Sequence, residues 1–259
     1  MERRRVFDED AALYDRCRPR YVPELFQDVL AASGLNQAGR VLEIGIGTGQ
    51  ATLPFLQTGC RLTAVELGER LATFCRRRFS GYKNLEVVTG DFLDFESQQP
   101  FDLIYSATAF HWIPEAQGLE KAFRLLREGG TLALFWNHPH PFYNDPTVAA
   151  AAQEVYRRHL PGRGEPKIYG REDGAARAQS IRRGGFSDVE TRWYTGWRVL
   201  DASAYIALLN TYSDHRSLPA PVRCALEREL IEIIDAAGGR VEIQDTIDLH
   251  LAHKGRANP

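Results

Sequence analysis

The chain has 259 residues, of which 44% are hydrophobic and 25% charged, an ordinary globular composition with enough residues for a sizeable core. Its formal net charge of −2 gives no sign of a nucleic-acid-binding surface, and no apolar run approaches the length of a membrane span. The four cysteines lack zinc-site spacing, and the first residues lack the apolar region of a secretory signal. We therefore expect a cytoplasmic protein with no nucleic-acid or membrane partner and no metal, while the oligomeric state stays open.

Residues 6–34 carry apolar side chains at helical spacing, interrupted at Pro19 and Pro23 and ending at Gly34. Tyr14 and Arg18 are four residues apart, so one helix would present both on the same face. Two interpretations are open for this segment. It is either a surface cap on the core or a lid that brings a phenol and a guanidinium over a ligand.

A glycine-rich turn follows the first apolar run, residues 40–44. The pattern predicts a buried parallel strand, a tight turn and a helix that begins at about Thr48. Glycine allows unusual backbone angles and lets a ligand approach the backbone closely, because it has no Cβ. The turn is therefore suited to holding a small molecule, and its glycines stand at every second position: Gly45, Gly47 and Gly49.

Acids also stand at or just after the ends of two later strands, at positions suited to binding a nucleoside. The second predicted strand, 61–66, ends in Glu66, which can accept hydrogen bonds from both ribose hydroxyls in nicotinamide and adenosylmethionine sites alike. A helix over 68–79 follows. The third strand, 85–88, runs into Gly90-Asp91-Phe92, where the carboxylate can accept from the adenine amino group and the aromatic ring can cover the base.

The fourth strand, 101–106, leads into a loop that contains His111 and Trp112. Ligands of open α/β sheets bind beyond the carboxyl ends of the strands, so this loop lies in the active crevice. A helix over 116–127 and a fifth strand over 131–136 complete an alternation of strands and helices. This alternation predicts a parallel sheet with helices on both faces.

The pattern changes after residue 136. Residues 137–143 suggest a loop, 147–160 a helix, and the charged, glycine-rich stretch 161–180 an inserted, partly mobile cap. His138 and His140 have metal-ligand spacing, but the proline between them and the lack of a carboxylate pattern argue against a metal site. A strand at 187–194, helices at 202–210 and 220–237, and a strand at 241–251 follow.

The sequence resembles the class I S-adenosylmethionine-dependent methyltransferases over roughly residues 7–136. The spacing E-x-G-x-G-x-G, which begins at Glu43, looks like motif I of that family. The sequence A-x-x-x-H-W at 107–112 and the form F-x-x-x-A-x-x-Y-D-x-x-R-P at 7–19 resemble small-molecule methyltransferases, a group that includes the trans-aconitate and ubiquinone-biosynthesis types.

This resemblance implies a Rossmann-like α/β fold with seven mostly parallel strands, in which an antiparallel seventh strand inserts between the fifth and sixth. Residues 1–259 would form one domain. Within it we expect a helical lid (1–34), a cofactor-binding core (35–136), an insertion or cap (137–185) and strands and helices that complete the sheet (186–259).

The implied activity is transfer of a methyl group from S-adenosylmethionine to a small acceptor. His111 would be the general base if the acceptor is a hydroxyl or a protonated amine. A carboxylate acceptor would need no base, and Arg18 or Arg20 could hold it. The cofactor would contact Tyr14, Arg18, Glu43, Gly45, Gly47, Gly49, Glu66, Leu67, Asp91, Phe92, Ser106 and Ala107.

Two other functions are weighed against this one. A nicotinamide oxidoreductase would need Gly or Ala where this chain has Gln50, and a Tyr-x-x-x-Lys pair is not recognisable at the crevice. A non-catalytic cofactor-binding protein is also compatible with the glycine turn and the ribose acid, because these features imply binding and not turnover.

Overall fold

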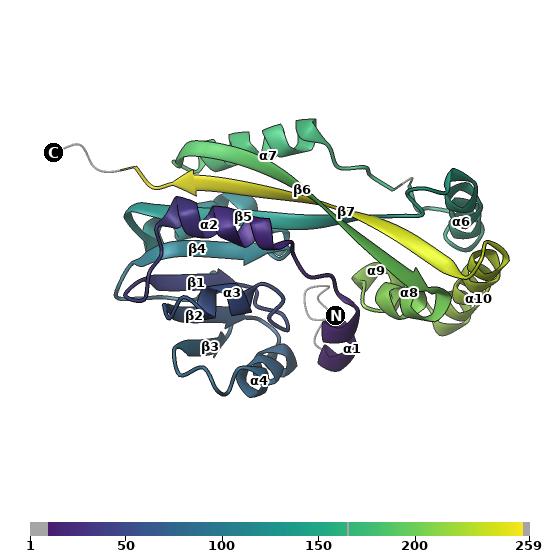
Figure 1. Cartoon of the computed structure of the whole chain (residues 1–259), viewed down its shortest axis with the longest axis horizontal. Helices are drawn as coiled ribbons and strands as arrows, with labels where there is room; N and C mark the ends of the chain where they lie inside the picture. The colour runs from purple at the N-terminus through teal and green to yellow at the C-terminus, as the bar shows by residue number, and fades with distance from the viewer. Residues whose placement is uncertain (1–9, 165, 256–259) are drawn as a thin grey trace.

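A computed structural model describes residues 10–164 and 166–255 and contains one seven-stranded sheet with the strand order β3-β2-β1-β4-β5-β7-β6 (Figure 1). β7 runs antiparallel to both of its neighbours, β5 and β6, and the other pairings are parallel. The expected fold, including the inserted antiparallel strand, is therefore confirmed. The strands are β1 (Arg40–Ile44), β2 (Arg61–Glu66), β3 (Leu85–Thr89), β4 (Phe101–Ala107), β5 (Leu126–Pro141), β6 (Ser187–Asp201) and β7 (Arg240–His253).

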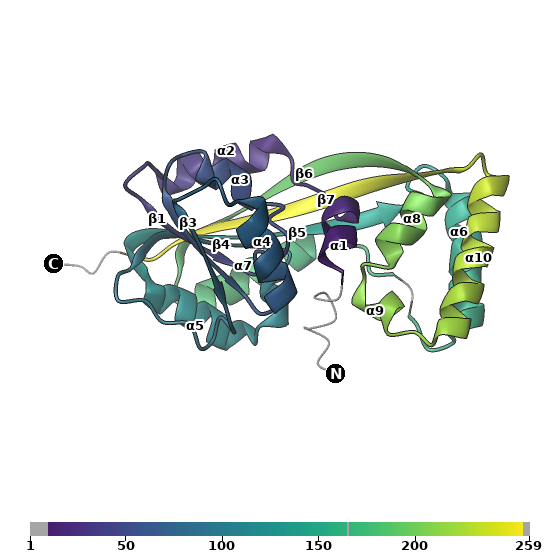
Figure 2. The ribbon, with the colours of Figure 1, turned by 90° about the horizontal axis from the view of Figure 1, so that it is seen from below.

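Helices cover both faces of the sheet, as Figure 2 shows with the sheet seen nearly edge-on. Helices α2 and α3 contribute to the apolar cluster on one face, and α5 and α7 to the cluster on the other. The helices are α1 (Ala11–Cys17), α2 (Pro23–Ser33), α3 (Thr52–Leu56), α4 (Glu69–Arg78), α5 (Glu115–Leu125), α6 (Pro146–His159), α7 (Arg171–Arg183), α8 (Ala202–Leu209), α9 (Ser213–Arg216) and α10 (Ala220–Ala236). None of the helices in the described ranges is long and apolar enough to cross a membrane.

A third apolar cluster forms a cap beyond the main sheet. The strands β5, β6 and β7 run past the ends of β1–β4, and α6, α8 and α10 pack around their extensions (Figure 1). Leu226, Leu230 and Ile234 on α10 are fully buried at helical spacing, which explains why this helix packs with one face on the cap. Helix α1 lies between the core and this cap.

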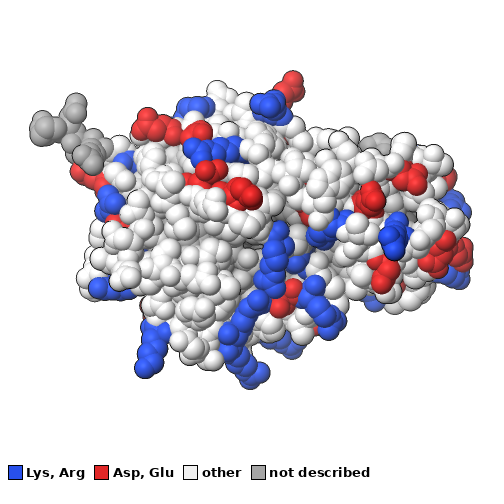
Figure 3. Space-filling model, viewed as in Figure 1, with Lys and Arg blue, Asp and Glu red and all other residues white. Residues whose placement is uncertain are grey.

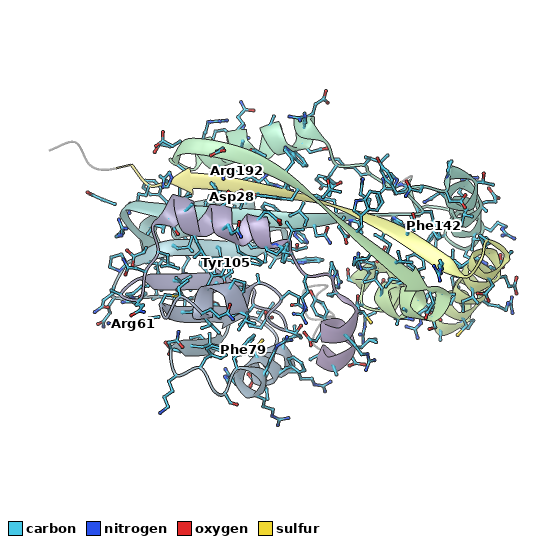
Figure 4. The ribbon with its side chains drawn as sticks, viewed as in Figure 1. Asp28, Arg61, Phe79, Tyr105, Phe142 and Arg192 are labelled. Atoms are coloured by element: carbon cyan, nitrogen blue, oxygen red, sulfur yellow. The ribbon has the colours of Figure 1, made fainter. Side chains whose placement is uncertain are left out.

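Both α1 and α2 fall where the helical spacing of residues 6–34 predicts helices, although Phe7 and Asp8 of that segment lie outside the described residues. Pro23 opens α2, where its missing N–H costs nothing, and Gly34 ends the helix in the left-handed region with φ 59°. On α2, Asp28 Oδ1 pairs with Nη1 of Arg192 on β6 at 2.5 Å (Figure 4), which holds α2 on the sheet.

The helix expected to begin at about Thr48 starts later than predicted. It begins at Thr52 and ends at Leu56, and residues 47–51 form turns. Gly47 and Gly49 have φ values of 58° and 86°, which a right-handed helix cannot contain. The same glycines that suit the turn to a ligand therefore delay the start of the helix.

The loop expected at 137–143 is wrong over residues 137–141, because β5 continues to Pro141, and a turn follows at 142–144. Residues 131–141 pair with β7, whereas the pairing with β4 ends at Phe135. One side of β5 is therefore unpaired beyond that point, and Pro139 and Pro141 need no hydrogen-bond donor there. The prolines indicated a loop, but they mark an edge instead. At its other end β5 starts at Leu126, immediately after α5, so the helix expected over 116–127 ends earlier.

The stretch 161–180, expected to be a partly mobile cap, contains most of α7. This helix runs from Arg171 to Arg183 and buries Gly174, Ala178 and Ile181. Ile181 packs in the same cluster as Leu119 of α5, so α7 covers the core sheet. Charged residues at both ends of the helix are exposed, whereas Arg177 points inward and pairs with Asp248 of β7. Strand β6 is also longer than predicted, because it extends to Asp201.

Candidate active site

A cavity of about 280 Å³ lies at the carboxyl ends of β1, β2 and β4, between the core, helix α1 and the cap. This is the edge at which open α/β sheets bind ligands, and the volume lies just below the usual range for small-molecule sites. Its walls combine the glycine turn, apolar side chains and a few polar groups from distant parts of the sequence.

The glycine turn presents bare backbone to this cavity. A Cβ at Gly45 would lie 2.5 Å from Cβ of Ala109, so that position has no room for any other residue. A Cβ at Gly47 would meet its nearest atoms only at 3.6 Å, in Gln50, and 3.7 Å, in Tyr14. The space beside Gly47 is thus open to a ligand, although its left-handed φ disfavours other residues.

Glu66 closes the turn at the end of β2. Its Oε2 accepts from the backbone N–H of Gly47 and its Oε1 from that of Gly68, both at 2.9 Å. The residue is 8% exposed and lines the cavity. A carboxylate oxygen can accept more than one hydrogen bond, so ribose hydroxyls could also donate to this group.

Glu43, the acid of the glycine motif, is buried beneath the turn and is 1% exposed. Thr52 Oγ1 donates to its Oε2 at 2.8 Å. Burial raises the pKa of Glu43 to about 8, and the nearby Glu66 carboxylate contributes in the same direction. At neutral pH the Glu43 carboxyl is therefore mostly protonated and neutral.

The segment after β4 is held in a strained conformation at the cavity. Thr108 has a φ of 51°, which is uncommon for a residue with a branched Cβ. Its Oγ1 lies 2.6 Å from the hydroxyl of Tyr21 and accepts from the backbone N–H of Asn137 at 3.2 Å. The hydroxyl thus joins the segment after α1, the β4 loop and β5 at one point in the wall.

Helix α1 contacts both the core and the cap. Asp15 pairs with Arg78 of α4 and accepts from Thr48 Oγ1 of the glycine turn at 3.2 Å. Arg18 lies over the ring of Tyr212, and its Nη2 donates to the Thr211 carbonyl at 2.8 Å. Figure 3 shows basic side chains gathered over the region of α1 and α4.

His111 lies on a single 3₁₀ turn, Phe110–Trp112, after β4. The residue lines the cavity and is partly accessible to solvent. Nε1 of Trp136 donates to Nδ1 of His111 at 3.1 Å. Desolvation lowers the pKa of His111 to about 4, and the neighbouring Arg177 acts in the same direction, so the ring is neutral at physiological pH.

The structure brings ten of the predicted site residues together in the wall of this cavity. They are Tyr14, Arg18, Glu43, Gly45, Gly47, Glu66, Leu67, Phe92, Ala107 and His111.

Three predicted residues lie outside the cavity wall. Gly49 packs on Phe79, because a Cβ there would approach that ring to 2.4 Å. Ser106 is fully buried and donates to the Ile44 carbonyl at 2.9 Å. Asp91 Oδ1 accepts from the Leu93 N–H at 2.9 Å, although its neighbours on both sides line the cavity.

Sequence reasoning missed several wall residues. Thr108 follows the carboxyl end of β4, and Asn137 lies on β5 two residues past the point where its pairing with β4 ends. Both positions therefore lie at the edge where open α/β sheets bind ligands. No local signal identifies the cap residues Tyr212, Ser213 and Asp214, because their place depends on how the cap folds onto the core.

Adenosylmethionine fits this cavity. The bare backbone at Gly47 leaves room beside the turn, Glu66 offers acceptors for hydroxyls, and Phe92 and Leu67 supply apolar wall for a base.

Comparisons with known proteins support the same conclusion. The family model described as a methyltransferase domain matches residues 41–130. An uncharacterized methyltransferase of Schizosaccharomyces pombe is 24% identical over 250 residues, which cover 95% of this chain and 94% of that protein. An uncharacterized methyltransferase of Mycobacterium tuberculosis is 30% identical over 131 residues, and the match spans about half of each chain, 51%.

A solved structure has the same fold. The S-adenosylmethionine-dependent methyltransferase from Thiobacillus denitrificans, in complex with S-adenosyl-L-homocysteine, superposes with a TM-score of 0.53 and 18% identity. The match covers 94% of this chain and 96% of that one.

Proposed function

We propose that the chain is a class I S-adenosylmethionine-dependent methyltransferase and that it transfers the cofactor's methyl group to a small-molecule acceptor bound in the same cavity. The observation that carries this proposal is the continuity of one cavity. Its wall includes the glycine turn and Glu66 of the core together with His111, Asn137 and Tyr212.

We assign the cofactor to the end of the cavity formed by the core. Glu66 would accept from the ribose hydroxyls, Phe92 and Leu67 would contact the adenine, and Gly47 would lie against the methionine part. The contact of Asp91 with the adenine amino group stays a prediction. Its Oδ1 already accepts from a backbone N–H, which favours a role in shaping the turn as well.

We assign the acceptor to the other end, under α1 and the cap. Arg18, His111 and Asn137 supply polar groups there, and Trp112, Pro139 and Tyr212 supply apolar surface. The modest volume and the cover by α1 and the cap favour a small molecule over a macromolecular segment.

When bound, the cofactor supplies a methyl group on a positively charged sulfur; the acceptor's lone pair forms the new bond to the methyl carbon, and the sulfur keeps the electrons of the bond that breaks. The chain's own contribution is to align acceptor and cofactor in line and to keep water out. Residues of α1 and the cap close over the cavity from two sides and serve the second purpose.

Two measurements test the proposal. Titration calorimetry should give saturable binding of S-adenosylmethionine and S-adenosylhomocysteine and negligible binding of NAD. Incubation with methyl-labelled cofactor and fractionated metabolites should then move label into a small molecule. Binding without transfer to any fraction would favour the non-catalytic alternative, and binding of NAD alone would favour an oxidoreductase.

A further inference from the structure

One hydrogen bond fixes the protonation state of the histidine in the cavity wall. Nε1 of Trp136 lies 3.1 Å from Nδ1 of His111. An indole nitrogen can only donate, so Nδ1 must offer a lone pair to it. The imidazole is then neutral and carries its single hydrogen on Nε2, because an imidazolium would point a second N–H at the indole N–H.

Trp136 is itself held firmly in place. It is 5% exposed on β5, and the guanidinium carbon of Arg177 lies 3.7 Å from the centre of its ring. Nη1 of Arg177 lies 2.6 Å from Oδ2 of Asp248, which is 1% exposed. The indole therefore cannot turn away from His111 without losing a cation–π contact that a buried ion pair supports.

The charges around His111 also disfavour an imidazolium. In addition to desolvation, Arg177 on α7, His138 on β5 and Arg18, which follows α1, all lower the pKa of His111. Asp248 on β7 is the carboxylate that contacts two of these residues, His138 and Arg177. It accepts from Nε2 of His138 at 2.9 Å and pairs with Arg177, so its charge is already compensated. Among the residues that the structure describes, the hydrogen-bond partner of His111 Nδ1 is the indole N–H of Trp136, which cannot stabilise a proton there.

We propose that His111 acts as a neutral hydrogen-bond donor through Nε2–H. Trp136 is the positioning residue that fixes this tautomer. The atom that accepts the hydrogen bond from His111 is a lone-pair atom of the methyl acceptor. This inference rests on the proposed function, because it assumes that the acceptor occupies the cavity beside His111. It revises the role expected from the sequence, since a nitrogen that already carries a hydrogen cannot take the acceptor's proton.

The inference narrows the class of acceptor. The reacting atom must be unprotonated in the bound state without help from His111, as in a carboxylate or an uncharged amine. A hydroxyl with an ordinary alcohol pKa would need a base that His111 does not provide. The acceptor must also offer an oxygen or nitrogen that accepts a hydrogen bond next to the reacting atom, or at it.

Nuclear magnetic resonance of the full-length, ¹⁵N-histidine-labelled protein tests the tautomer directly. Long-range ¹H–¹⁵N spectra distinguish a protonated ring nitrogen from an unprotonated one, and the signals that disappear in His111→Gln identify the ring. We expect a protonated Nε2 and an unprotonated Nδ1, unchanged from about pH 5.5 to about pH 8. A ring that titrates in this range, or one with its proton on Nδ1, would overturn the proposal.

Variants then test the role of Trp136. Trp136→Phe keeps an aromatic ring but removes the donor, so the titration midpoint of His111 should rise by about one pH unit or more, or both tautomers should appear. Trp197→Phe, at a tryptophan 53% exposed on β6, is the matched control and should change nothing. An unchanged His111 spectrum in folded Trp136→Phe would remove Trp136 from the proposal.

The wild-type spectrum decides the tautomer even if Trp136→Phe does not fold. Calorimetric titration of the same sample with S-adenosylhomocysteine separates the two proposals. If S-adenosylhomocysteine does not bind, the proposed function is contradicted but the tautomer result is unaffected. If it binds and the His111 ring titrates, only this inference is contradicted.

Discussion

The guanidinium carbon of Arg18 lies 4.3 Å from the centre of the Tyr212 ring, so helix α1 is attached to the cap as well as to the core. The sequence placed Arg18 over the cofactor. The structure adds that this side chain holds two parts of the cavity wall together, with Nη2 on the carbonyl of Thr211. The structure therefore gives the lid interpretation one specific contact, which a mutation can remove so that the effect on the lid can be measured.

The first prediction concerns this lid. Hydrogen exchange over residues 10–21 should be fast in the free protein and slow at saturating S-adenosylhomocysteine, because a ligand beneath α1 favours its closed position. Arg18→Gln should keep exchange fast in both states. Arg16→Gln is the control, since Arg16 is exposed on the same helix. Equal exchange with and without ligand across the segment would mean that α1 is a fixed cap.

The second prediction concerns Glu66. Glu66→Gln should weaken S-adenosylhomocysteine binding by roughly 1–3 kcal/mol, or about 5- to 150-fold, because a charged acceptor is lost. Glu66 also accepts from the N–H groups of Gly47 and Gly68, so Glu66→Ala should lower the melting temperature in addition. Glu69→Gln, an exposed acid in the first turn of α4, should leave calorimetric affinity unchanged.

The third prediction separates backbone strain from ligand space. Gly47 and Gly34 have nearly equal φ values, 58° and 59°, but only Gly47 lines the cavity. Substituting either by Ala should cost roughly 1–2 kcal/mol of unfolding free energy, because both force a Cβ into the left-handed region. Only Gly47→Ala should also weaken cofactor binding. Equal affinities in the two folded variants would mean that the turn is not in contact with the cofactor.

The core of the fold was predictable because its signals are local. Buried parallel strands are short, almost wholly apolar runs, and β1 shows this with Val41, Leu42 and Ile44 each at most 2% exposed. Glu66 and the glycine turn could be located for the same reason, since a strand end and its turn are adjacent in sequence. The errors arose where pairing overrides local preference, as in β5, whose prolines lie on an unpaired side.

The cap side of the site was not predictable in this way. Tyr212 and Asp214 reach the cavity only because α8 and α9 follow the long extension of β6, and nothing in the local sequence fixes that placement. The protonation state of His111 depends on Trp136, which is 25 residues away in sequence. A motif can nominate a histidine, but its tautomer is set by its neighbours in the fold.

The fourth prediction concerns stability and pH. The pKa of Glu43 is raised to about 8 by burial, from an ordinary value of 4.5. Between these values the folded chain retains a proton that the unfolded chain has released, so this group's contribution to stability falls as pH rises through that window. Glu43→Gln should therefore flatten the decline in urea-unfolding free energy between about pH 5 and about pH 8. Glu86→Gln, exposed on β3, should keep the wild-type slope.

The last prediction concerns methyl transfer itself, measured with labelled cofactor and the metabolite fraction that accepts label. If His111 donates through Nε2, the side-chain amide of glutamine can place an N–H near the same point, so His111→Gln should keep activity within about tenfold of the wild type, a loss of about 1.4 kcal/mol or less. His111→Ala removes the donor and should lose more. If His111 were a general base, neither variant could take a proton, and both should lose activity to a similar extent. The ratio of the two variants therefore separates a donor from a base, provided that both bind S-adenosylhomocysteine with the affinity of the wild type.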